Sequence, residues 1–68
     1  MHLKIGELIK NRRSLLRLTQ EDLSQMSGVG MSTIHQIEKG VGNPSYQTLE
    51  RLFQILGLEF IVQIKNTN

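Results

Sequence analysis

The stretch Leu18–Gly40, LTQEDLSQMSGVGMSTIHQIEKG, decides the fold of this chain. Its local signals predict two short helices joined by a tight turn. Thr19 is a good N-cap residue, and Asp22 three positions later can reach back toward it, as in a capping box. Gly28 stands where the first of the two helices must end in a left-handed residue. Two short helices joined at a sharp angle by a glycine turn form a helix-turn-helix.

The apolar positions of this stretch give each helix an inner face. Leu23 and Met26 form that face in the first helix, and Ile34 and Ile37, three positions apart, form it in the second. The second helix is therefore expected to begin near Met31 and to turn its other side chains outward. These outward positions are Met31, Ser32, Thr33, His35 and Gln36.

Helices are also predicted on both sides of this stretch. A first helix is expected over Leu3–Leu16, and Ser45 can cap a last helix over Tyr46–Leu56, which ends at Gly57. The loop before Ser45 contains Pro44, which cannot continue a helix. The apolar stripe of the first helix is Ile5, Leu8, Ile9, Leu15 and Leu16, interrupted by Arg12, and that of the last is Leu49, Leu52, Phe53 and Leu56.

The C-terminal stretch Leu58–Lys65, LEFIVQIK, alternates and is rich in β-branched and aromatic residues, which predicts a strand. No other segment is predicted to form a strand, so this strand has no predicted pairing partner within the chain. We expect antiparallel pairing with the same strand of a second copy, through Phe60, Ile61, Val62, Gln63 and Ile64. The alternatives are a disordered tail or an extra helical turn. The expected organisation is a helix-turn-helix domain over 1–57, a dimerisation strand over 58–65 and a tail over 66–68.

The composition limits the kind of protein this can be. Sixty-eight residues make one small domain. The absence of cysteine suits a reducing compartment, and no apolar run approaches the roughly 18 residues that a membrane span needs, so a cytoplasmic location is expected. The net charge is +2, with cations concentrated near the N-terminus, where only Glu7 opposes them. Such a basic face suits a polyanion, although it can also be a solvated helix face. The cations are Lys4, Lys10, Arg12, Arg13 and Arg17.

Catalytic and cofactor chemistry is not expected. The chain has no nucleophile elbow, P-loop or cysteine, and its carboxylates are scattered without a pairing spacing. His2 and His35 lie far apart with no other soft ligand, so neither a metal site nor a cofactor is predicted. His2 is expected to be a solvated terminal residue.

With these motifs in place, the chain resembles the Xre or lambda-repressor-like helix-turn-helix family over roughly Ile5 to Leu58. The resemblance implies an all-α bundle of four to five short helices. It departs from the family at Gly30, where serine or threonine is usual. The matching residues are Leu18-Thr19-Gln20-Glu21-Asp22-Leu23, Gly28-Val29, Ser32-Thr33-Ile34, Ile37-Glu38-Lys39-Gly40, Asn43-Pro44-Ser45, Thr48-Leu49 and Leu56-Gly57.

The resemblance also implies roles in binding double-stranded DNA. In the family, residues at the positions of Arg13 and Glu38 form a partly buried ion pair; the alternative is two separate surface charges. Base contacts fall on Met31, Ser32, Thr33, His35 and Gln36, of which Gln36 can pair with adenine, and His35 can reach either guanine or a phosphate. Thr33 can instead face inward and pack the turn. Phosphate contacts fall on Arg12, Arg17, Thr19, Gln20, Lys39, Asn43, Ser45 and Tyr46.

A C-terminal strand that pairs across a homodimer narrows the resemblance to the HipB antitoxins. This implies a repressor that binds an inverted-repeat operator and a HipA-type kinase toxin. A stand-alone Xre-family regulator without a toxin is the alternative. A protein-interaction module that no longer reads DNA is a third, but the polar outward residues of the second helix favour DNA.

Overall fold

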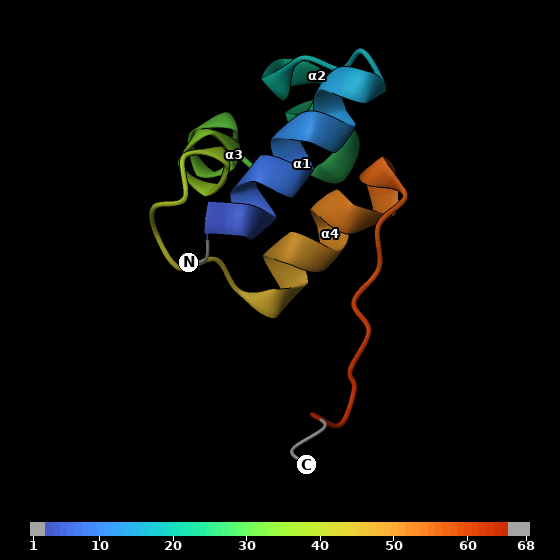
Figure 1. Ribbon diagram of the computed structural model, residues 1–68. Helices are drawn as coiled ribbons and strands as arrows, with labels where there is room; N and C mark the ends of the chain where they lie inside the picture. The colour runs from blue at the N-terminus through green and yellow to red at the C-terminus, as the bar shows by residue number, and fades with distance from the viewer. Residues whose placement is uncertain (1–2, 66–68) are drawn as a thin grey trace.

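The computed structural model describes residues 3–65 and shows a bundle of short helices followed by an extended tail (Figure 1). The helices found in this range are α1 (Leu3–Leu15), α2 (Gln20–Ser27), α3 (Met31–Glu38) and α4 (Tyr46–Leu56), and residues 3–65 contain no strand. The predicted all-α fold with a helix-turn-helix in α2 and α3 is confirmed. None of these helices is long and apolar enough to cross a membrane. His2 and the predicted tail over 66–68 lie outside the described residues.

The helix ends follow from local hydrogen bonds that the sequence predicts. The hydroxyl of Thr19 accepts a bond from the Asp22 amide, and the Asp22 carboxylate accepts one from the Thr19 amide, each at 2.9 Å. Gly28 ends α2 in the left-handed region, with φ 76°. The Ser45 hydroxyl accepts from the Thr48 amide at 3.1 Å, and Gly57 ends α4 with φ 71°. These caps satisfy backbone groups that a helix end otherwise leaves unpaired.

The core lies where the four helices meet. α1 and α2 each pack against both α3 and α4, so that neither half of the helix-turn-helix stands alone. The buried apolar residues of α3 and α4 are those that the helical spacing predicts. The core comprises Ile9, Leu23, Val29, Ile34, Ile37, Leu49, Leu52, Phe53 and Leu56.

The prediction for the inner face of α1 was wrong in part. Leu8, Leu15 and Leu16 are 44%, 69% and 42% exposed, and only Ile9 of the proposed stripe is fully buried. The reason is that Arg12 and Arg13 occupy the inward positions in the turn after Ile9. Their guanidinium groups hydrogen-bond to α4 and α3, respectively. Met26, predicted to line the inner face of α2, is likewise 55% exposed.

Close backbone contact joins α1 to the C-terminal end of α3. Gly6 is buried there, and a Cβ atom on it would overlap the Ile37 carbonyl oxygen and lie 3.2 Å from that of Glu38. Any larger residue would push the two helices apart. Glycine at this position therefore helps to set where α3 lies.

The tail is held at its start and free beyond it. The Leu58 amide bonds to the Phe53 carbonyl at 2.9 Å, and the Phe60 ring stacks on that of Phe53 with 4.4 Å between centroids. Beyond Phe60 the chain leaves the bundle (Figure 1), and Val62 and Ile64 are 98% and 99% exposed. The predicted strand is not formed in the single chain, because a strand needs a neighbour for its backbone groups and none is present within residues 3–65. The alternative of an extra helical turn is also not observed.

Candidate nucleic-acid interface

The outward face of α3 is polar and accessible. Ile34 and Ile37 are buried and fix the rotation of the helix, so the side chains between them point away from the core. Thr33 is exposed, which does not support its packing inward against the turn. Gly30 caps α3 without any side-chain hydrogen bond. All the residues predicted to contact bases are exposed, namely Met31, Ser32, Thr33, His35 and Gln36.

A largely buried ion pair holds α3 against α1. Nε and Nη2 of Arg13 donate to the two Glu38 carboxylate oxygens at 2.7 and 3.0 Å, and the two side chains are only 14% and 4% exposed. The hydrogen bond to Glu38 raises the pKa of Arg13. Nη1 of Arg13 also donates to the Leu18 carbonyl at 2.8 Å, at the entrance to the helix-turn-helix. A bidentate arrangement of this kind fixes geometry as well as charge.

α2 joins the same network through Gln20. Its Nε2 donates to Oε1 of Glu38 at 3.1 Å, so one carboxylate ties together side chains from three helices. A glutamine amide carries two hydrogens, and Glu38 takes one of them. The other makes no hydrogen bond within residues 3–65, and Gln20 lines an open cleft.

Two grooves of opposite character flank α3. On one side, an open cleft of about 340 Å³ lies between α1, α2 and α3; we call it the basic cleft. On the other side, a groove of about 170 Å³ lies between α3 and the loop that leads to α4, and no charged side chain lines it. The basic cleft is lined by Lys10, Arg13, Gln20, His35, Glu38 and Lys39, and the neutral groove by Thr33, Gln36, Ile37, Val41, Gly42, Asn43 and Pro44.

The residues predicted to contact phosphate fall into separate groups. Gln20 and Lys39 line the basic cleft, and Asn43 lines the neutral groove. Thr19 caps the N-terminus of α2. Arg17 is exposed in the turn after α1.

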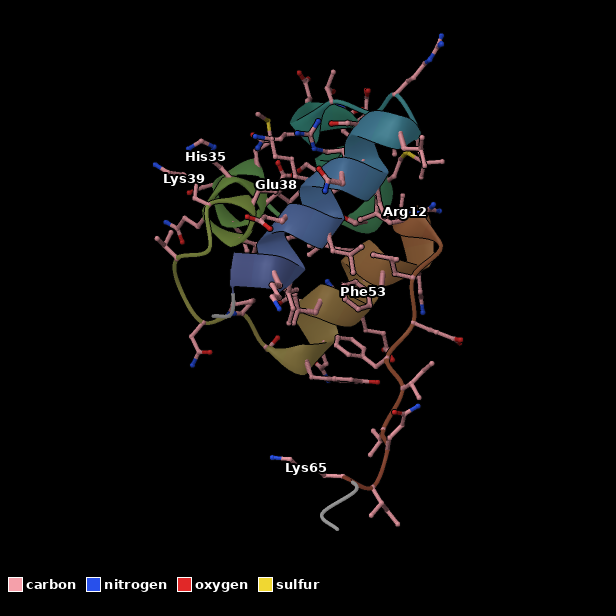
Figure 2. The ribbon with its side chains drawn as sticks, viewed as in Figure 1. Arg12, His35, Glu38, Lys39, Phe53 and Lys65 are labelled. Atoms are coloured by element: carbon pink, nitrogen blue, oxygen red, sulfur yellow. The ribbon has the colours of Figure 1, made fainter. Side chains whose placement is uncertain are left out.

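The other three predicted phosphate contacts, like Thr19 and Gln20, make hydrogen bonds within the protein. Ser45 caps α4, and the Tyr46 hydroxyl donates to the Glu50 carboxylate at 3.2 Å, which raises the pKa of Tyr46. Nε and Nη2 of Arg12 donate to the Leu56 carbonyl at 3.0 and 2.8 Å. Figure 2 shows Arg12 beside the end of α4, away from His35 and Lys39.

The sequence prediction missed Lys10 as a member of this surface. It appeared only as one of several N-terminal cations, whereas the structure brings it into the cleft that contains His35 and Lys39. The available signal was its spacing of three from Arg13, which places the two side chains on neighbouring turns of one helix face.

Comparison with known proteins agrees with this architecture. Residues 9–62 match a family described as Helix-turn-helix. The chain belongs to this family. It is 42% identical over 57 residues to an uncharacterised HTH-type transcriptional regulator of Methanothermobacter thermautotrophicus, a match that covers 84% of this chain and 83% of the relative. A regulator of the same description from Methanocaldococcus jannaschii is 39% identical over 51 residues, covering 75% and 77%. A third, from Haemophilus influenzae, is 43% identical over 53 residues, which are 78% of this chain but 53% of that protein.

Proposed function

We propose that this protein is a sequence-specific regulator that binds double-stranded DNA and represses transcription. The exposed polar face of α3, held on a rigid bundle and flanked by a basic cleft, carries this proposal. A recognition helix of this type enters the major groove and reads base edges with its N-terminal residues. The family match and the relatives, each called an HTH-type transcriptional regulator, support it.

Within the interface, the exposed residues of α3 take the base contacts. Gln36 bonds adenine in the bidentate manner of a glutamine, Ser32 bonds either type of base edge, and Met31 or Thr33 packs on a thymine methyl group. Thr19 and Gln20 hold a phosphate at the N-terminus of α2, where unpaired amides and the helix dipole favour an anion. Arg17, Lys39, Asn43, Ser45 and Tyr46 are proposed for flanking phosphates, and Arg12 least of these, because Leu56 already engages its guanidinium.

Binding to a selected inverted-repeat duplex tests base reading. We expect Gln36→Ala to lose about 1–3 kcal/mol on the selected site and little on random DNA. Gln54→Ala is the matched control, because Gln54 is an exposed glutamine of α4 in the groove beside the tail. Equal weakening of both duplexes by Gln36→Ala would remove Gln36 from the base contacts. If the wild-type protein prefers no duplex over random DNA, the proposed function is wrong.

We further propose that the protein acts as a homodimer on half-sites about one helical turn, roughly 34 Å, apart. The exposed apolar side chains beyond Phe60 support this, because pairing with a second copy would satisfy the backbone groups of this segment. It would also set Ile61, Val62 and Ile64 beside side chains of the partner strand. Truncation after Phe60 keeps the ring that stacks on α4 and should give monomers by sedimentation velocity. Removal of residues 66–68 alone is the control. A dimer that persists after the longer truncation would assign dimerisation to another surface.

The tail also supports a narrower role, that of a HipB-like antitoxin that represses its own operon and binds a HipA-type kinase toxin. The alternative is a stand-alone regulator with the same DNA contacts. Co-purification with the product of the adjacent gene separates the two. A kinase that elutes in complex with this protein supports the antitoxin role, and a neighbour that encodes no kinase refutes it.

A further inference from the structure

The charges of the basic cleft do not cancel. Its lining contains three cationic side chains and one carboxylate, and the bidentate bond between Arg13 and Glu38 uses that carboxylate. Two ammonium groups therefore remain beside one open cavity, that of Lys10 on α1 and that of Lys39 just after α3. Both side chains are exposed, and neither makes an ion pair within residues 3–65. Two like charges facing one cleft favour the binding of an anion between them.

The charge is also one-sided with respect to α3. A helix in the major groove, which is about 12 Å wide, has one DNA backbone on each side. Here one side of α3 presents the basic cleft, whereas the other presents the groove of Thr33, Gln36 and Asn43, which no charged side chain lines. Electrostatic attraction to phosphate is therefore concentrated on the side where α1, α2 and α3 meet.

We propose that the basic cleft binds one backbone phosphate of the duplex, shared between Lys10 and Lys39, with the second amide hydrogen of Gln20 as a neutral donor. This assignment rests on the proposed DNA-binding function, adds Lys10 to its residues and places Lys39 on the phosphate that Gln20 binds. The ligand is a phosphodiester monoanion. A nucleotide is a poorer fit, because no Phe, Tyr or Trp side chain lines the cleft on which a base could stack.

A phosphate in the basic cleft would be connected by hydrogen bonds to the ion pair that positions α3. Gln20 donates to Glu38, which accepts from Arg13, so three successive hydrogen bonds would connect a phosphate bound by Gln20 to Arg13 of α1. Binding there fixes the backbone of the DNA relative to the ion pair that positions the recognition helix. Contacts of this kind set register and orientation rather than sequence preference.

The salt dependence of binding to a mixed-sequence duplex tests the shared site. The slope of log K against log salt counts neutralised phosphates at about 0.9 each. If one phosphate is shared, Lys10→Gln and Lys39→Gln should each weaken binding and leave the slope nearly unchanged, because the other lysine still neutralises it. The double variant should flatten the slope by about 0.9. Lys65→Gln is the matched control, since Lys65 is exposed on the tail, far from His35 and Lys39 (Figure 2).

Each contrary outcome has a definite meaning. A double variant with the slope of the Lys65→Gln control overturns the site. Two single variants that each flatten the slope by about 0.9 overturn sharing, because they identify two separate phosphates. Inorganic phosphate that competes with DNA for the wild type and not for the double variant, at constant ionic strength, assigns the cleft to a free anion instead. A wild type that binds no duplex at low salt overturns this inference together with the proposed function, whereas binding without sequence preference overturns only the latter.

Discussion

Replacing Glu38 by glutamine isolates the charge of the group that joins α1, α2 and α3. The carboxylate accepts two bonds from Arg13 and one from Gln20, and its side chain is 4% exposed. Glutamine keeps the shape and one acceptor oxygen but leaves the Arg13 guanidinium without its counter-charge. Removing one partner of a buried pair typically destabilises by about 3–5 kcal/mol, because the remaining charge stays desolvated.

That loss is comparable with the whole stability of the domain. At about 0.05–0.15 kcal/mol per residue, a chain of 68 residues has roughly 3–10 kcal/mol. Each kcal/mol corresponds to about 4–8 °C in Tm for a domain of this size, so we expect a decrease of at least about 12 °C. The measurement is urea and thermal unfolding followed by far-ultraviolet circular dichroism, with Glu50→Gln as the control. Glu50 is an exposed carboxylate that bonds only the Tyr46 hydroxyl among the described contacts, so its loss should stay within about 0.5 kcal/mol.

A second variant separates the buried charge from simple loss of packing. The pair Arg13→Met with Glu38→Leu removes both charges, and apolar replacements of similar volume often restore or exceed the original stability. We therefore expect the double variant to be more stable than Glu38→Gln. If Glu38→Gln costs less than about 1 kcal/mol, the pair behaves as a surface salt bridge and the reasoning from burial is refuted.

Three further predictions concern other parts of the fold. Gly6→Ala should destabilise by about 1–3 kcal/mol, because its methyl group would displace the Ile37 carbonyl; an unchanged urea midpoint would contradict this contact. Arg12→Ala should destabilise by about 1.5–3 kcal/mol through loss of its bonds to the Leu56 carbonyl, and should flatten the salt slope of DNA binding by no more than about 0.9; an unchanged slope would remove Arg12 from the proposed phosphate contacts. The hydrogen bond from the Thr19 amide lowers the pKa of Asp22, so this cap stabilises the fold above the unfolded-state pKa of about 4 and is lost as the pH falls through the lower folded-state value. Between pH 7 and pH 3, the urea midpoint of Asp22→Asn should therefore decrease less than that of the wild type. An identical decrease in the variant and the wild type would contradict the linkage.

The sequence determined the helix-turn-helix because the signals that define it are local. Thr19 with Asp22, Gly28, Ser45 and Gly57 each act on backbone groups within a few residues, so α2 and α4 begin and end where those residues predict. The spacing of Ile34 and Ile37 likewise fixed which face of α3 is buried and which is exposed. Periodicity failed on α1, because it counts leucines as core and cannot show that arginines take the inward positions.

Tertiary structure decided the features that depend on long-range contacts. Arg12 bonds the end of α4, which is 44 residues away in the sequence, and Gln20 bonds Glu38, which is 18 residues away. The basic cleft exists only because α1 brings Lys10 to the side of α3 that carries Lys39. A charged side chain in a helix has the same local preference whether it meets water, a carboxylate or a carbonyl group. Its partner is set by the packing of the helices, and that packing determines which cations remain available to a phosphate.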